Sequence, residues 1–317
     1  MGTGQEAYRS GRVTVPAARI YWEASGNPAG IPVLYLHGGP GSSLGSGSYR
    51  SLYDPARFYT VGLDQRGCGH STPPAPEDLG NLSANTTQTL IADIEAVRRE
   101  LGIGRWLVSG VSWGSTLAMA YSLQHPDRVL GIALAAVTTT GREEVDWITA
   151  GVGRFCPEAW AEFAAAAKAL PGERLVEAYA RRLAGPDRGD ALVAARHWER
   201  WEAAVAGLEP APAGGSRFND AQLMTFALLV THYWSHDAFL PGNQAVLARG
   251  HELDGIPGRL IHGECDAGSP PGTARELHRR WPSSRLQVLA GEGHLGASAW
   301  AALSSAVAEL GAAHRHS

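Results

Sequence analysis

The sequence predicts an α/β fold in which a mostly parallel central sheet is flanked by helices and interrupted by a helical cap. Short apolar runs alternate with segments of helical periodicity up to about residue 140, and the alternation resumes near residue 250. Such alternation is typical of a parallel sheet covered on both faces. The stretch between these parts reads as helical and is rich in Ala and Trp. We therefore predict a core domain of residues 1–140 and 250–317 and a cap domain of residues 141–249.

The elements of the core are predicted in chain order from their periodicity. Residues 12–22 read as an opening hairpin, and later strands are expected at residues 33–36, 58–63, 106–111, 129–137, 260–263 and 285–289. A helix over residues 86–101 carries its apolar side chains on one face. Further helices follow Ser112, cover residues 273–281 and begin near Ser298. The cap would lie over the carboxyl edge of the sheet, where folds of this kind bind ligands.

Composition narrows the classes of function. Lys and Arg number 27 against 31 Asp and Glu, so the net charge is −4 and no basic patch suggests nucleic acid or an anionic membrane. No apolar run reaches about 18 residues, the length that predicts a membrane span. The three cysteines (Cys68, Cys156 and Cys265) are far apart, which fits a reducing cytoplasm and no metal site. The N-terminus has no secretory-type apolar region.

From these features we expect a cytoplasmic protein without cofactor or metal. Its expected partner is a small molecule or a short peptide, rather than nucleic acid or a membrane. The sequence indicates no oligomeric state.

The most informative motif is the run Gly110-x-Ser112-x-Gly114, which lies between a predicted strand and a predicted helix. Glycines on both sides of the serine allow a tight turn that lifts Ser112 out at the tip of the strand. A serine held there is placed to attack a carbonyl group. An ordinary strand-to-helix turn could also match this short pattern by chance. Because a predicted strand precedes the motif and a predicted helix follows it, we favour a nucleophile.

A serine nucleophile needs a base and a carboxylate that orients the base. Asp266 follows the strand at residues 260–263, and His294 follows the strand at residues 285–289. The chain order Ser, Asp, His is that of an α/β-hydrolase. Either residue alone could belong to a turn or a helix cap, but both follow successive predicted strands. Glu264 and Asp254 are weaker alternatives for the carboxylate.

The oxyanion of an acyl-transfer reaction needs preorganised donors. One is expected to be the backbone N–H of Trp113, directly after the nucleophile. The other is expected from the glycine-rich turn at residues 37–41, with Gly39 as the main contributor. Gly38 of the same turn is expected to contact substrate.

Several motifs together resemble the proline iminopeptidase family of α/β-hydrolases. They are His-Gly-Gly-Pro-Gly at 37–41, Asp-Gln-Arg-Gly at 64–67 with His70-Ser71, and Gly-x-Ser-Trp-Gly-Ser-Thr at 110–116. The similarity extends over nearly the whole chain. It implies a serine exopeptidase that removes an N-terminal residue, typically proline, from small peptides. In this resemblance residues 64–67 form a structural loop near the oxyanion turn, to which we assign no chemical role.

The resemblance also implies two cap glutamates that bind the free ammonium group of the substrate. The first matches Glu202, whereas Val230 stands at the position of the second, before the pair that contains Tyr233. We expect Glu202, Val230 and Tyr233 to contact substrate. An aliphatic residue in place of the second carboxylate weakens binding of an amine and makes room for an apolar or acylated group.

Aromatic residues at helical spacing in the cap are expected to pack the cap rather than bind substrate, with Trp113 as the exception in the active site.

Three functions remain open at this point. The leading one is a serine hydrolase that acts on an N-terminal amide through an acyl-enzyme. The second is an esterase, lactonase or acyl-amide hydrolase for a small hydrophobic substrate without a free amine. The third is a non-catalytic binding protein on a hydrolase scaffold, which an intact set of Ser112, Asp266 and His294 disfavours.

Overall fold

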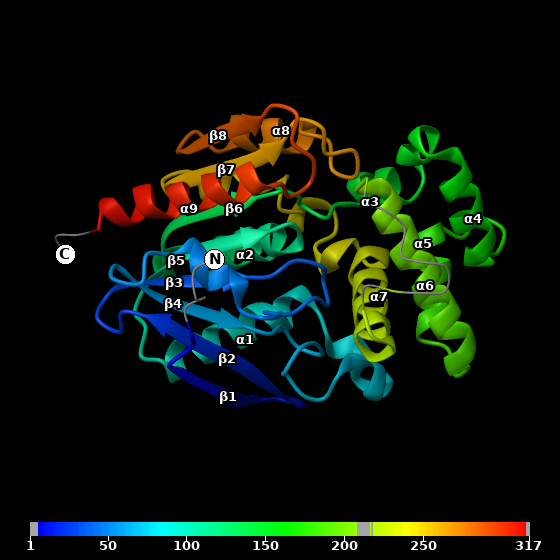
Figure 1. The fold of residues 1–317 in the computed structure, drawn as a ribbon, viewed down its shortest axis with the longest axis horizontal. Coiled ribbons are helices and arrows are strands. Elements are labelled where there is room, and N and C mark those ends of the chain that lie inside the picture. The colour runs from blue at the N-terminus through cyan, green and yellow to red at the C-terminus, as the bar shows by residue number, and fades with distance from the viewer. Residues whose placement is uncertain (1–5, 208–215, 217, 315–317) are drawn as a thin grey trace.

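A computed structural model describes residues 6–207, 216 and 218–314 of the chain, so both ends of the predicted core domain and part of the predicted cap lie outside it. Its centre is an eight-stranded sheet of order β1-β2-β4-β3-β5-β6-β7-β8 (Figure 1). The first two strands pair antiparallel, β2 pairs antiparallel with β4, and the strands from β4 to β8 run parallel. The strands are β1 (Arg9–Val15), β2 (Ala18–Gly26), β3 (Ile31–Leu36), β4 (Phe58–Leu63), β5 (Trp106–Val111), β6 (Val129–Ala135), β7 (Gly258–Gly263) and β8 (Ser284–Leu289). The predicted mostly parallel α/β fold is confirmed.

Helices cover both faces of this sheet. The helices of the core are α1 (Thr87–Glu100), α2 (Trp113–Gln124), α8 (Gly272–Arg280) and α9 (Ala297–Ala312). Alternate residues of a strand point to opposite faces. In β3, Leu34 belongs to the apolar cluster shared with α1 and α2, whereas Val33 belongs to the cluster beneath α9. Burial on both faces explains why the central strands are apolar throughout rather than alternating.

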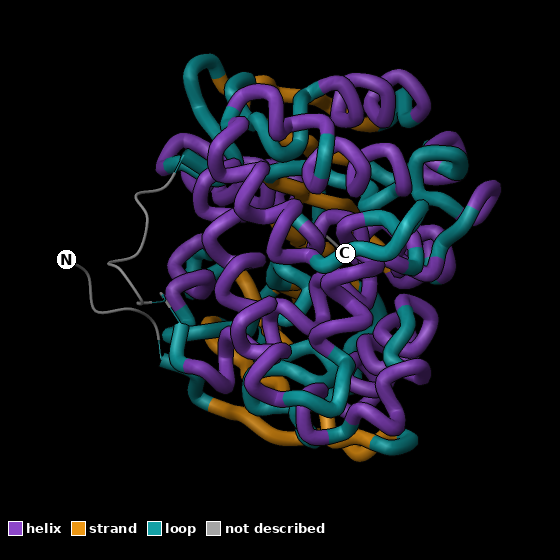
Figure 2. Tube along the Cα trace, turned by 90° about the vertical axis from the view of Figure 1, so that its right-hand side faces the viewer, coloured by secondary structure: helices purple, strands orange, loops and turns teal. Residues whose placement is uncertain are grey.

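The helices between β6 and β7 form a separate layer at one edge of the sheet (Figure 1). They are α3 (Arg142–Thr149), α4 (Pro157–Ala167), α5 (Leu175–Leu183), α6 (Arg188–Val205) and α7 (Asp220–Ser235). Viewed from that side, helices lie in front of the strands (Figure 2). This segment is the one predicted as the cap, and the exact domain limits at residues 140 and 250 stay a prediction.

Aromatic side chains pack the cap internally. Phe163 of α4 stacks on Tyr179 of α5 at 4.7 Å between ring centroids and on Trp201 of α6 at 5.0 Å. Trp198 meets the same cluster edge-on and is fully buried. The predicted packing role is confirmed for Trp198 and Trp201. No helix within the described ranges is long and apolar enough to cross a membrane.

Candidate active site

The turn at Ser112 is built by close approaches that only glycine allows. A Cβ atom at Gly110 would lie 2.2 Å from the carbonyl oxygen of Gly114, and one at Gly114 would lie 2.1 Å from that of Leu36. Ser112 itself has φ 53° and ψ −125°, a backbone conformation that costs a non-glycine residue energy. Its N–H donates to the carbonyl of Ala135 at 3.0 Å. The strained serine is thus held between β5 and α2 at the carboxyl edge of the sheet.

The structure brings Ser112, His294 and Asp266 together from three strand ends. His294 Nε2 lies 2.9 Å from Ser112 Oγ, and His294 Nδ1 lies 2.7 Å from Asp266 Oδ2. The other oxygen of Asp266 accepts the backbone N–H of Ser269 at 2.9 Å. Nucleophile, base and carboxylate therefore lie in one hydrogen-bonded row, the geometry of an acyl-transfer triad. The alternative carboxylate Glu264 instead lies near the N–H of Gly291 at 3.4 Å.

Charges around the triad set its protonation states. Burial alone would raise the pKa of Asp266, but the hydrogen bond and charge of His294 outweigh burial and hold that pKa below its usual value. Burial acts to lower the pKa of His294, whereas its hydrogen bond to Asp266 and the charges of Asp266 and Glu202 raise it, with a net increase. Asp266 therefore stays ionised, and His294 is a stronger base than a free imidazole.

The glycine-rich turn lies beside the nucleophile. A Cβ at Gly38 would lie 3.2 Å from the carbonyl oxygen of Val111 and 3.3 Å from Ser112 Cβ, tighter than most such contacts, so the turn approaches the serine closely. Gly39 has φ 111°, in the region that favours glycine. Trp113 begins α2, and the first N–H groups of a helix have no partner within the helix. Both expected oxyanion donors thus lie next to Ser112, at the same cavity.

The triad opens into a cavity of about 390 Å³ between core and cap. Gly38, Gly39, Trp113 and Glu202 line it together with the three triad residues. Apolar side chains form much of the remaining wall: Val145, Ile148, Val205, Phe226, Trp234 and Leu295. Its size is that of a site for a small ligand. Glu202 brings a carboxylate to this apolar wall and accepts a hydrogen bond from Trp198 Nε1 at 2.7 Å.

Two expected substrate contacts require correction. Val230 is fully buried and does not line the cavity, although Phe226 and Trp234, one turn before and one turn after on the same face of α7, do line it. Tyr233 is also outside the lining. Its ring packs on Trp113 at 4.8 Å between centroids, and its hydroxyl donates to Asn85 Oδ1 at 2.5 Å. Tyr233 packs on Trp113 from the core side rather than from the cavity, because α7 turns this side chain towards the core.

The structure also adds residues that the sequence pattern did not single out. Trp234 lines the cavity, so the packing role predicted for the cap tryptophans is incomplete for this residue. Gln65 contacts both Trp113 and His37 in the loop to which no chemical role was assigned. Its place two residues after the end of β4 is the available signal in the sequence. Within the described part of the chain, no group of three or more His, Cys, Asp or Glu side chains could hold a metal ion.

Comparison with known proteins extends these observations. Residues 31–297 match the family model described as alpha/beta hydrolase fold. The chain is 43% identical over 299 residues to a probable proline iminopeptidase from Streptomyces coelicolor, with 91% of this chain and 90% of that protein covered. It is 39% identical over 289 residues to a proline iminopeptidase from Neisseria gonorrhoeae, with 90% of each chain covered.

Solved structures show how widely the fold is shared. The crystal structure of a proline iminopeptidase from Mycobacterium smegmatis superposes with a TM-score of 0.64 at 21% identity, covering 96% of this chain and all of that one. A haloalkane dehalogenase from Bradyrhizobium elkanii reaches the same TM-score at 18% identity, with 96% and 98% covered. The fold alone therefore does not specify the reaction. The sequence relatives do specify the family, and the chain belongs to the proline iminopeptidase family of α/β-hydrolases.

Proposed function

We propose that the protein is a serine hydrolase that releases an N-terminal residue, typically proline, from small peptides or amides through an acyl-enzyme. The observation that carries this proposal is the row from Ser112 Oγ to His294 Nε2 to Asp266 at 2.9 Å and 2.7 Å, at the floor of a cavity that contains Glu202. The relatives named proline iminopeptidase support the same reaction.

In the proposed mechanism Ser112 Oγ attacks the carbonyl carbon of the scissile bond as its proton passes to His294 Nε2. Asp266 remains ionised and stabilises the imidazolium that forms. The negative charge on the former carbonyl oxygen is received by the N–H groups of Gly39 and Trp113. His294 then gives its proton to the departing amine, which leaves the acyl group on Ser112. Water, deprotonated by His294, attacks the ester, and Ser112 recovers its proton when the acid is released.

Recognition of the first residue would combine carboxylates with an apolar wall, since Glu144 lines the cavity as well as Glu202. A substrate ammonium group that leaves water needs an opposite charge and hydrogen bonds. Glu202 supplies a carboxylate at the cavity, and Gly38 lies beside the reacting serine. Phe226, Trp234 and Ile148 provide apolar surface for a compact ring such as that of proline. The proposed partner is accordingly a small molecule or short peptide.

One observation favours a second candidate, an esterase or acyl-amide hydrolase for substrates without a free amine. The residues of α7 that line the cavity are Phe226 and Trp234, and both are apolar. The position where the family resemblance implies a second carboxylate carries the buried Val230. A wall of this kind accepts an acylated or uncharged group at less cost than a cation.

A substrate panel separates the two candidates. Prolyl and other aminoacyl arylamides would be compared with their N-acetyl forms and with short acyl esters, using kcat/KM. Higher values for free amines support the peptidase, and faster turnover of blocked or uncharged substrates supports the second candidate. Ser112→Ala should lower kcat by about 10⁴-fold or more with the fold intact. Unchanged activity in that variant, or a native protein that a fluorophosphonate does not label, would overturn the catalytic assignment.

We also propose that the protein works in the cytoplasm. Cys68, Cys156 and Cys265 are free thiols, an arrangement typical of a reducing compartment. Cell fractionation with an antibody against the native chain tests this, and recovery outside the cytoplasmic fraction would contradict it.

A further inference from the structure

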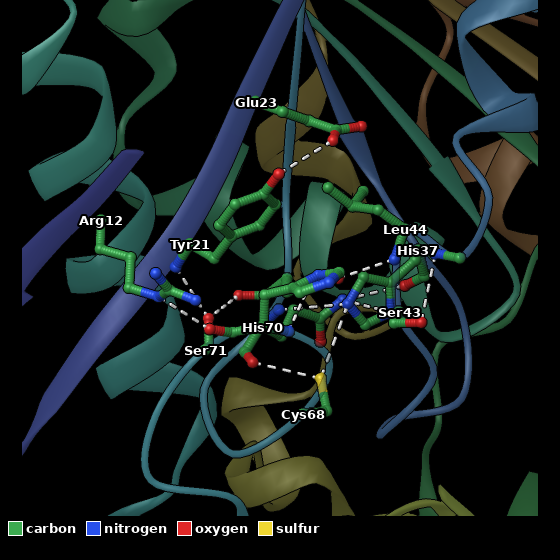
Figure 3. Close-up of polar contacts among 12 residues, drawn as sticks. Arg12, Tyr21, Glu23, His37, Ser43, Leu44, Cys68, His70 and Ser71 are labelled. Carbon is green, nitrogen blue, oxygen red and sulfur yellow. Dashed lines mark hydrogen bonds and ion pairs between the residues drawn. The ribbon is translucent and has the colours of Figure 1, made fainter. Parts of the chain in front are cut away.

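Gln65 lies two residues after the end of β4, between the two backbone segments that carry the proposed oxyanion donors. Its side chain is buried, with 3% of the residue exposed. The surrounding loop belongs to a dense set of polar contacts that includes His37, Leu44, Cys68 and His70 (Figure 3). A buried amide of this kind must satisfy its donors and its acceptor within the protein.

The amide oxygen of Gln65 is paired with Trp113. Trp113 Nε1 donates to Gln65 Oε1 at 2.8 Å. An indole N–H can only donate, so this contact assigns the oxygen of the amide to the side facing Trp113. Because the backbone N–H of Trp113 is one of the two proposed oxyanion donors, Gln65 braces the residue that carries it.

The remaining donors of Gln65 hold His37. Gln65 Nε2 donates to the carbonyl oxygen of His37 at 2.9 Å, and the backbone N–H of Gln65 donates to His37 Nε2 at 3.1 Å. His37 Nε2 is therefore an acceptor, and the ring proton lies on Nδ1, which is 2.9 Å from the carbonyl oxygen of Gly38. Burial lowers the pKa of His37 and keeps its ring neutral.

This contact to Gly38 acts on the second oxyanion donor. The carbonyl of Gly38 and the N–H of Gly39 belong to one trans peptide group, in which they point in opposite directions. A hydrogen bond that fixes the carbonyl therefore also fixes the direction of the Gly39 N–H. Gln65 is thus linked to one donor through Trp113 and to the other through His37 and Gly38.

We propose that Gln65 is a positioning residue that holds the two oxyanion donors in a fixed relation to each other. The inference rests on the proposed function, because it presupposes that Gly39 and Trp113 stabilise an oxyanion. Such donors accelerate a reaction only when they are aimed in advance at the position where charge develops. The neighbouring Asp64 holds the segment that follows the glycine-rich turn, since its Oδ1 accepts the N–H of Leu44 at 2.7 Å.

The test replaces Gln65 and distinguishes a loss of transition-state stabilisation from a loss of substrate binding in the ground state. Gln65→Met keeps an unbranched side chain of similar length and removes both amide contacts. Gln65→Glu keeps the shape and the acceptor for Trp113 but cannot donate to His37. For a prolyl arylamide we expect kcat to fall about 10- to 100-fold in either variant, with KM within about twofold of the native value. Labelling of Ser112 by a fluorophosphonate should slow by a similar factor.

Asp93→Asn is the matched control for loss of stability. Asp93 anchors the same loop through a two-pronged contact with Arg66 at 2.7 Å and 2.9 Å, and within the described residues no hydrogen bond or ion pair joins it to His37 or Trp113. This control should lower the melting temperature and leave kcat and the labelling rate near their native values. A purely structural role for Gln65 would give the same pattern in the Gln65 variants, and that result would overturn the inference.

Trp113→Phe adds a second, independent arm. It removes the indole N–H that meets Gln65, so its effect and that of Gln65→Met should not multiply in the double variant. Fully multiplicative losses in kcat would contradict coupling between the two residues. If Gln65→Met does not fold, Gln65→Glu carries the measurement. A native protein that is neither labelled nor active refutes the proposed function itself, whereas active native protein with unaffected variants refutes only the role of Gln65.

Discussion

Trp198 and Glu202 lie one turn apart on α6, and the indole N–H of the first donates a 2.7 Å hydrogen bond to the carboxylate of the second. Trp198 is fully buried in the aromatic cluster of the cap, so its position is fixed by packing. The carboxylate of Glu202 is consequently held at the cavity, where it also acts on the catalytic histidine through its charge. In the proposed function, this residue links recognition of the amine to the strength of the base.

Glu202→Gln should selectively weaken substrates that carry a free amine. The variant keeps the size of the side chain and an acceptor for Trp198 but removes the negative charge. We expect KM for a prolyl arylamide to rise about 10-fold, because hydrogen bonds to a charged group contribute about 1.5–3 kcal/mol. KM for the N-acetyl analogue should change little. Steady-state kinetics on both substrates measure this, with Glu162→Gln on the exposed face of α4 as the control. Equal losses on both substrates would contradict recognition of the amine by Glu202.

The pH profile should report the raised pKa of His294. His294 accepts the proton of Ser112 only when its ring is neutral, so kcat/KM should fall as the pH drops through the pKa of this residue. Burial lowers that pKa, but Asp266 and Glu202 raise it above the ordinary value of 6.5. The buried His262 lies beside Asp266 and is a further titratable neighbour of the triad. The acidic limb should therefore have its midpoint above pH 6.5.

The same profile in Glu202→Gln tests the cause. Loss of the Glu202 charge should shift the acidic limb to lower pH, whereas Glu162→Gln should leave it in place. Because Asp266 remains ionised in both proteins, the direction of the shift depends on Glu202 alone. An acidic limb with an unchanged midpoint would show that the charge of Glu202 does not affect the pKa of His294.

The catalytic row could be predicted from the sequence because each member follows a segment that reads as a strand, with short apolar runs before Ser112 and Asp266 and an alternating pattern before His294. Parallel strands bring their carboxyl ends to one edge, so Ser112, Asp266 and His294 meet there whatever the lengths of chain between them. The glycines at residues 110 and 114 also indicate a tight turn. In the structure, a Cβ atom at these positions would lie 2.2 Å and 2.1 Å from a backbone carbonyl oxygen.

The cap was harder to predict because its helices are apolar on more than one side. In α7 the residues from Leu223 to Tyr233 are buried apart from Thr225, so periodicity does not reveal which face meets the cavity and which meets the core. Only the family resemblance therefore predicts Val230 and Tyr233 as cavity residues, and the structure does not place them there. The role of Gln65 could not be predicted either, since it depends on hydrogen bonds to residues 28 and 48 positions away.

Gly114→Ala should disrupt both stability and activity. The added methyl group would lie 2.1 Å from the carbonyl oxygen of Leu36 and 2.9 Å from that of His37, backbone atoms next to the oxyanion turn. We expect a loss of about 1–3 kcal/mol in the free energy of unfolding, measured with urea, and a large loss of kcat. Gly104→Ala is the control, because a Cβ there meets no atom within 4 Å, and it should change stability by less than about 1 kcal/mol. Comparable stability of the two variants would contradict the tight turn.

Val230→Glu should shift selectivity towards free amines, because Val230 lies between two residues of α7 that line the cavity. Phe226 and Trp234 are one helical turn away on either side, so a longer side chain from the same face extends towards the same space. A carboxylate there would add a negative charge from α7 to that of Glu202 on α6. We expect kcat/KM for a prolyl arylamide to rise relative to its N-acetyl form, together with a lower melting temperature, because Val230 is fully buried.

Val230→Gln is the control that isolates the charge, since its side chain has the same length and shape. Both variants should lose stability through the bulk and polarity that they introduce. Only the glutamate should gain selectivity for free amines, because only the carboxylate attracts a cation. If the glutamine variant shows the same selectivity, added bulk rather than charge is responsible. If neither variant changes selectivity, the side chain at position 230 does not reach the cavity. Amine recognition then depends on Glu202 without a carboxylate from α7.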